Sequence, residues 1–100
     1  MQPTEKRINS KELQKIFNEK GFWERASSGE LKVEVMSEKH PSPLKSAQPP
    51  CTLSQILAYF DNQGQEVARV HQYKRPDGSL GGSGRPDPKR LFINGVIYKI

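Results

Sequence analysis

A chain of 100 residues suffices for one domain and not for two, so we expect residues 1–100 to form a single domain with a small core. The sequence is only 33% hydrophobic and has no long apolar run, which excludes a membrane-spanning helix. One cysteine excludes an internal disulfide, and the polar start lacks the apolar stretch of a signal peptide, so we expect a cytoplasmic protein. The net charge of +5 permits RNA or another anionic partner, although the cations form no continuous basic block.

The first predicted element is a helix over residues 10–20. Asn9 and Glu12 have the spacing of a capping box, which satisfies backbone donors at the start of a helix. The apolar residues recur with the spacing of one helical face, at Leu13, Ile16 and Phe17. Gly21 follows and can take the left-handed conformation that ends a helix.

Residues 22–26 and 31–36 are predicted to form a β-hairpin, because the four residues between them include Gly29. In the second strand the apolar residues alternate with polar ones, at Leu31, Val33 and Val35. This alternation predicts one buried and one solvated face. Residues 37–51 contain four prolines and are predicted to form a long loop.

Residues 53–61 fit two periodicities. A helical stripe would contain Leu53, Ile56, Leu57 and Phe60, whereas a strand would place Ile56, Ala58 and Phe60 on one face. We favour the strand, because residues 62–65 have good turn chemistry and the following segment is strongly β-like.

Residues 66–74 give the clearest strand pattern in the chain. One face would carry Ala68, Val70 and Gln72, and the other Val67, Arg69, His71 and Tyr73. Two turn signals follow, and residues 85–90 are predicted to be a loop or a single helical turn. Asn94-Gly95 predicts a hairpin between residues 91–93 and 96–100.

These elements predict an α+β domain in which the N-terminal helix packs on a curled antiparallel sheet of five or six strands. We expect the helix to cover the side of the sheet that carries Ala68 and Val70. The apolar surface for this contact would come from Leu31, Val33, Val35, Ile56 and Phe60. Arg69, His71 and Tyr73 would then lie on the open side.

Arg69, His71 and Tyr73 are therefore the predicted catalytic residues. Imidazole titrates near neutral pH and can act as a general acid or base. Arginine can hold a phosphate through two hydrogen bonds, and tyrosine can stack on a base. Together these groups suit a metal-independent ribonuclease, whereas the structural interpretation is a solvent-facing row with Tyr73 packed on a neighbour.

The loop after this strand is a second candidate, because its glycines can present backbone N–H groups to an anion and several cations surround it. The predicted anion- or nucleic-acid-binding residues are Lys74, Arg75, Gly82, Gly84, Arg85, Lys89 and Arg90. The segment is not a P-loop, since no Gly-Lys-Ser/Thr sequence follows a strand. The alternative is a surface loop stiffened in part by proline.

Two further pairings of side chains are possible. His40 and His71 could supply an acid and a base for RNA cleavage, and Cys51 could be a nucleophile with His71 as its base. No signature sequence surrounds either pair. Two histidines and one widely spaced cysteine do not make a structural zinc site, so we expect no metal and no cofactor.

The sequence from His71 to Gly78, continued from Gly82 to Lys89, resembles a pattern in small bacterial and phage proteins without an assigned role. The resemblance implies a prokaryotic or phage setting. A helix followed by an antiparallel sheet that carries histidine and arginine is also similar in architecture to the barnase–EndoU–colicin–RelE group of ribonuclease toxins. No catalytic position is carried over from that group.

Two functions follow as hypotheses. The first is a small basic protein directed at RNA, as a binder or a ribonuclease. The second is a phage or mobile-element interaction module that binds and inhibits a host protein. No motif names a reaction, so the sequence does not decide whether the protein is an enzyme.

Overall fold

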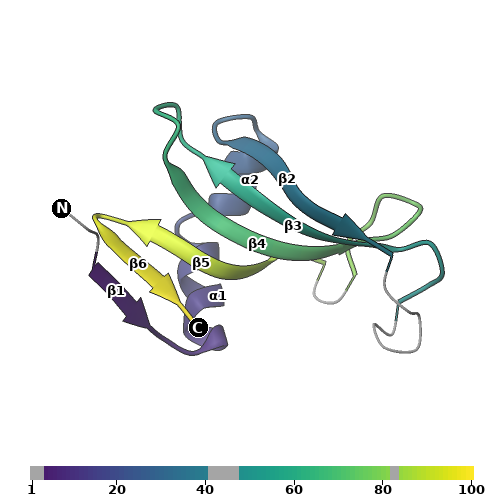
Figure 1. Cartoon of the computed structure of the whole chain (residues 1–100), viewed down its shortest axis with the longest axis horizontal. Helices are drawn as coiled ribbons and strands as arrows, with labels where there is room; N and C mark the ends of the chain where they lie inside the picture. The colour runs from purple at the N-terminus through teal and green to yellow at the C-terminus, as the bar shows by residue number, and fades with distance from the viewer. Residues whose placement is uncertain (1–3, 41–47, 82–83) are drawn as a thin grey trace.

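A computed structural model describes residues 4–40, 48–81 and 84–100, which form a six-stranded sheet and two short helices (Figure 1). In chain order the elements are β1 (Thr4–Arg7), α1 (Ser10–Glu19), α2 (Phe22–Ser27), β2 (Lys32–Lys39), β3 (Leu53–Phe60), β4 (Glu66–Lys74), β5 (Asp87–Ile93) and β6 (Val96–Lys99). The sheet is curled and open, and both helices lie on the same side of it (Figure 1). The predicted α+β class is confirmed.

The strands follow the order β1-β6-β5-β4-β3-β2 across the sheet. From β2 to β6 each strand pairs antiparallel with the next one along the chain. The exception is β1, which pairs parallel with β6 at one edge. All four residues of β1 are polar and exposed, so no apolar alternation revealed this strand in the sequence. The fold therefore begins with a strand, and α1 follows it.

The start and end of α1 agree with the prediction. The Asn9 side chain accepts a hydrogen bond of 2.8 Å from the Glu12 backbone, and its amide nitrogen donates to the Glu12 carboxylate at 3.1 Å. Leu13 and Phe17 are fully buried. Gly21 has a φ of +65° and ends the helix in the left-handed region.

The predicted hairpin of residues 22–26 and 31–36 is wrong, because residues 22–27 form α2. Phe22 is buried and stacks on Phe17 with ring centroids 6.0 Å apart, and Trp23 and Ala26 pack against the same cluster. The turn-like residues 27–30 suggested a hairpin, but the apolar positions before them fit one short helical face. In the part of the chain that the structure describes, no helix is long and apolar enough to cross a membrane.

The core is a single cluster between the helices and the sheet. Its buried members are Leu13, Phe17, Phe22, Leu31, Leu57, Tyr59, Ala68, Val70 and Leu91. Ala68 and Val70 thus face the buried side of β4. Residues 53–60 form a strand, as favoured, and not the alternative helix.

Two predictions about burial are wrong: the other side of β3 faces the core, and β2 is more exposed than expected. Leu57 and Tyr59 reach the core, whereas Ile56 is 36% exposed. All eight residues of β2 are exposed, including Val33 at 40% and Val35 at 55%, so of the predicted alternating residues only Leu31 is buried. The physical reason is that β2 lies at the edge of the sheet, where α1 and α2 do not cover its apolar side chains.

The core-facing side of the sheet becomes polar at the C-terminal ends of β2 and β4 and the N-terminal end of β3. The Gln55 side chain donates to Glu38 at 2.6 Å, and Gln72 donates to Gln55 at 2.8 Å. This ladder crosses three strands and satisfies the buried Gln55 amide. The strand β2 also extends to Lys39, so the predicted loop starts later than expected.

The C-terminal hairpin is confirmed, and its first strand is longer than predicted. Asn94 and Gly95 have φ values of +50° and +79°, as a two-residue turn of this type requires. Residues 87–90 belong to β5 instead of forming a loop or helical turn. The prolines at 86 and 88 concealed this strand, and a register shift between its pairs with Arg69 and Val70 accommodates it.

Candidate functional site

The side of the sheet opposite the core cluster, which we call the helix-free face, carries Arg69, His71 and Tyr73. All three side chains are half-buried. Their cross-strand partners on β3 are Ala58, Ile56 and Ser54. The three predicted residues therefore form one continuous row on an open surface.

His71 lies in a small polar cluster with its neighbours. Its Nε2 atom is 2.8 Å from the Ser54 hydroxyl oxygen, a hydrogen bond whose donor depends on the imidazole tautomer. The Tyr73 ring meets the His71 ring edge-on, with centroids 4.8 Å apart. Ser54 and Tyr73 thus fix the orientation of the imidazole.

The surroundings of His71 favour its neutral form. Burial lowers the pKa of His71 below its ordinary value of 6.5, and the nearby Lys89 lowers it further. Asp87, the cross-strand partner on β5, opposes this shift, and Lys39 adds to it. A neutral imidazole at pH 7 can accept a proton or a hydrogen bond.

Glu66 joins the helix-free face through a β-bulge. Phe60 pairs with Glu66 and Tyr59 with Ala68, which leaves Val67 as an extra residue that packs against the core. Val67 was expected on the face of Arg69, and this expectation is wrong because the bulge interrupts the alternation. Glu66 takes that face instead.

The Glu66 carboxylate lies between two guanidinium groups. Arg69 donates to one carboxylate oxygen at 2.6 Å and Arg90 to the other at 2.8 Å. Burial alone would raise the pKa of Glu66, but the hydrogen bonds from Arg90 and Arg69 outweigh it and lower the pKa. Glu66 is therefore ionised at neutral pH. The buried Nε of Arg69 has no hydrogen-bond partner within the described residues.

A row of four cations crosses the helix-free face. Arg69 pairs with Arg90, Arg90 with Lys99, and Lys99 with Arg7, so the row runs over β4, β5, β6 and β1. At the usual strand spacing it spans about 14 Å. Glu66 lies between the two arginines of β4 and β5, and Glu5 forms an ion pair of 2.9 Å with Lys99. We call these four residues the cation row.

The cation row contains more positive than negative charge. Like charges directly opposite each other on neighbouring strands are destabilising. Two carboxylates, Glu66 and Glu5, form ion pairs in this row of four cations. The four cations therefore exceed the two carboxylates, and a bound anion could neutralise this excess of positive charge.

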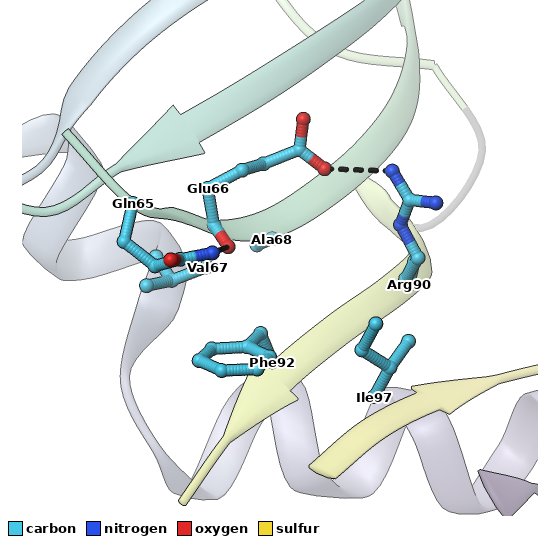
Figure 2. Close-up of a pocket in the computed structure, with 7 residues that line it drawn as sticks. All are labelled: Gln65, Glu66, Val67, Ala68, Arg90, Phe92 and Ile97. Atoms are coloured by element: carbon cyan, nitrogen blue, oxygen red, sulfur yellow. Dashed lines mark hydrogen bonds and ion pairs between the residues drawn. The ribbon is translucent and has the colours of Figure 1, made fainter. Parts of the chain in front are cut away.

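A pocket of about 290 Å³ opens beside the cation row (Figure 2). Phe92, Ile97, Val67 and Ala68 form its apolar part, and Arg90 and Glu66 lie at one side of it (Figure 2). Gln65 lies on the other side, and its side-chain nitrogen donates to the Glu66 backbone oxygen at 3.3 Å. We call this cavity the Phe92 pocket.

Two of the predicted anion-binding residues lie with the helix-free face. Arg90 belongs to the cation row. Lys89 is exposed at the register shift of β5 and close enough to His71 to lower its pKa. Both residues were expected in a loop, but a strand positions them.

The other predicted anion-binding residues are not gathered into one cluster. Arg75 donates from Nε to the Gln48 side chain at 3.2 Å. Arg85 lies against α2 on the opposite side of the sheet, where it donates to Glu24 at 3.0 Å and covers the Trp23 ring. Lys74 and Gly84 are exposed, and Gly82 lies outside the described residues.

The structure does not bring His71 together with His40 or with Cys51. His40 follows the end of β2, two strands from β4, a backbone separation of about 10 Å. Cys51 precedes β3, and His71 pairs with Ile56 farther along that strand, so backbone positions of the two are more than about 10 Å apart. Within the described ranges, no three His, Cys, Asp or Glu residues lie together as a metal site.

Sequence reasoning missed Glu66, Lys99, Arg7 and the Phe92 pocket. The Asn94-Gly95 turn already implies that Ile93 pairs with Val96, and counting outward from it places Arg90 opposite Lys99. This pairing would have predicted that Arg90 and Lys99, two of the four residues of the cation row, lie side by side. The position of Glu66 had no such signal, since a bulge determines it.

The chain matches no protein-family model, no curated protein sequence and no solved structure. The resemblances to small bacterial and phage proteins and to ribonuclease toxins therefore stay predictions.

Proposed function

We propose that the helix-free face binds single-stranded RNA. The observation that carries the proposal is the cation row of Arg69, Arg90, Lys99 and Arg7, which lies in register across four strands. Neutralising phosphates releases counterions, and this term dominates the affinity of proteins for nucleic acids. A row of cations at strand spacing can follow one extended phosphate backbone.

The shape of the face favours a single strand over a duplex. The face is a sheet surface, and among the residues that the structure describes it carries no helix that could enter a groove. Its half-buried rings include Phe60, Tyr73 and Phe92, on β3, β4 and β5. Unpaired bases stack on such rings, and the His71 and Ser54 side chains can hydrogen-bond to a ribose hydroxyl.

Binding is better supported than cleavage. Cleavage of an RNA backbone needs a base for the attacking hydroxyl and an acid for the leaving group. His71 can serve as one of these groups, but its Nε2 already faces Ser54. His40 follows β2, two strands from His71.

The test measures affinity for a single-stranded RNA over a range of salt concentrations. For single strands the slope of log K against log salt is about −0.7 per phosphate, so four contacts predict about a 50-fold loss between about 50 and 200 mM salt. Arg90→Gln together with Lys99→Gln should halve that slope, because two of the four cations are removed. Parallel measurements on single-stranded DNA and double-stranded RNA should give weaker binding.

The matched control is Lys15→Gln combined with Lys20→Gln. Lys15 lies on α1, on the other side of the sheet, and its side chain is 74% exposed. The control removes the same charge and should leave the slope unchanged. An equal loss of slope in both double variants would mean that net charge, and not the cation row, causes binding.

Absence of RNA binding at about 50 mM salt would overturn the proposal. The protein-interaction function would then be favoured. One observation supports that second candidate: the edge strand β2 exposes the apolar side chains of Val33, Val35 and Met36.

A further inference from the structure

The Phe92 pocket lies where the ladder between β4 and β5 ends, next to the bulge in β4. The ladder between β4 and β5 runs from the pair Ala68–Leu91 to the pair His71–Asp87. Beyond Ala68 the bulge turns Val67 toward the core and Glu66 toward the helix-free face. The space left beside Phe92 and Ile97 is the pocket (Figure 2).

The lining of the pocket combines a flat apolar surface with a charged edge. Phe92 offers an aromatic face, and Ile97 extends the apolar surface beside it (Figure 2). At the edge the Glu66 carboxylate and the Arg90 guanidinium are joined at 2.8 Å, so an acceptor and a donor lie next to each other. A planar ring that carries both N–H and carbonyl groups matches this arrangement.

The volume also suits such a ring. A cavity of about 290 Å³ has the volume of about ten waters in the liquid, and a purine has about ten non-hydrogen atoms. The pocket lies directly beside Arg90, which belongs to the cation row, so a nucleotide could place its base in the pocket and its phosphate on the row. This arrangement is the usual one in single-strand recognition, where bases stack and phosphates meet cations.

We propose that the Phe92 pocket takes an unpaired guanine base of the bound strand. Guanine places two N–H donors, at N1 and N2, beside the carbonyl acceptor O6, and no other standard base has this set. The donors would bond to Glu66 and the carbonyl to Arg90. An ionised carboxylate offers about four acceptor sites, so Glu66 can bond to guanine while it keeps Arg69 and Arg90.

This inference rests on the proposed binding of RNA, and the experiment separates the two. The probe is a uridine-rich single strand with one central position that is guanine, adenine, cytosine or uracil. The wild-type protein should bind the guanine strand about tenfold more tightly than the others, the discrimination expected from one good two-bond contact to a base. A strand with 1-methylguanine, which lacks the N1–H donor, should lose this advantage.

Two variants test the residues. Phe92→Leu should abolish the preference for guanine while the slope of affinity against salt stays close to that of the wild-type protein, because it removes no charge. Glu66→Gln should also abolish the preference. Phe60→Leu is the matched control, because Phe60 lies on the helix-free face beside Lys32 and outside this pocket. It should keep the preference, whatever it does to the overall affinity.

The outcomes that overturn the inference are distinct from those that overturn RNA binding. Salt-dependent binding with no preference for guanine would leave the proposed function in place and refute the guanine pocket. The same conclusion would follow if the preference survived in both pocket variants. If Phe92→Leu does not fold, the 1-methylguanine strand and Glu66→Gln decide the question, since neither removes an apolar side chain.

Discussion

At the scale of single residues, the helix-free face depends on contacts that hold charged and polar groups in place. Glu66 holds Arg69 and Arg90 through its two carboxylate oxygens, and Ser54 and Tyr73 hold the His71 ring. The ion pairs of Glu66 contribute roughly 1 kcal/mol each at most, because the two arginine side chains are more than a third exposed. Their main effect is to fix the positions of the guanidinium groups.

The His71 environment predicts a dependence of stability on pH. Because the folded protein holds the pKa of His71 below its ordinary value of 6.5, the unfolded chain takes up the proton first as the pH falls. The free energy of unfolding and Tm should therefore both decrease as the pH drops through about 6.5 and below. Thermal unfolding at a series of pH values between about 7.5 and 5.5 measures this effect.

His71→Asn should flatten this dependence, because it removes the titrating group. The matched control is His40→Asn, which removes the other histidine at an exposed position after β2. If the pH dependence persists in His71→Asn, or disappears in His40→Asn, then the assignment to His71 is wrong.

At the scale of elements, Gly21 determines how the two helices meet. It ends α1 with a φ of +65°, and its backbone oxygen accepts the first hydrogen bond of α2, from Arg25 at 2.9 Å. Gly21 therefore both ends α1 and caps the start of α2. This sharp turn lets Phe22 stack on Phe17 within the core.

Gly21→Ala should destabilise the protein by about 1 kcal/mol, which lowers Tm by roughly 4–8 °C. The added Cβ atom would meet nothing within 4 Å, so the loss comes from backbone strain alone. Gly21→Asn should be less harmful than Gly21→Ala, since asparagine tolerates the left-handed region better. Chemical unfolding followed by circular dichroism gives both values. An alanine variant as stable as the wild-type protein would contradict this account of the turn.

The edge strand β2 has two features that oppose the addition of a further strand. Its residues are all exposed, and a register shift between Val35 and Ser37 interrupts its ladder with β3. Charged residues at Lys32 and Glu34 lie on the same strand. Bulges and charges of this kind discourage further strands from joining a sheet edge.

At the scale of the whole molecule, the apolar core stabilises one part of the sheet. The hydrogen bonds that join Glu38, Gln55 and Gln72 stabilise another part. Phe17 is fully buried and contacts both the second helix and the sheet, with ring centroids 6.0 Å from Phe22 and 6.4 Å from Tyr59. The burial of Tyr59 raises its pKa to about 12, so its hydroxyl stays protonated over the physiological range. Phe17 is thus the residue that joins α1, α2 and β3.

Phe17→Ala should cost about 3–5 kcal/mol, a large part of the roughly 5–15 kcal/mol that stabilises a domain. Val35→Ala, at a side chain that is 55% exposed, should change stability by less than about 0.5 kcal/mol. Urea unfolding followed by Trp23 fluorescence and by circular dichroism should give one coincident transition for the wild-type protein. A loss below about 1 kcal/mol in Phe17→Ala would show that this ring does not join the elements as the structure indicates.

Much of the fold could be predicted because its signals are local. The cap at Asn9, the left-handed Gly21, the strand of residues 66–74 and the Asn94-Gly95 turn each depend on a few neighbouring residues. Where the expectation was wrong, the deciding contact was distant in sequence. Phe22 belongs to a core cluster that includes Tyr59 and Leu91, far along the chain, and Val35 is exposed because neither α1 nor α2 covers it.

The sequence by itself determined that Arg69, His71 and Tyr73 share one side of a strand, because side chains alternate along extended backbone. Only the tertiary structure decided what lies around them. The bulge at Val67 brought Glu66 to that side, and strand order brought Arg90, Lys99 and Arg7 into line with Arg69. Bulges and strand order follow from packing of the whole sheet against the helices, a non-local balance that no short segment of the chain encodes.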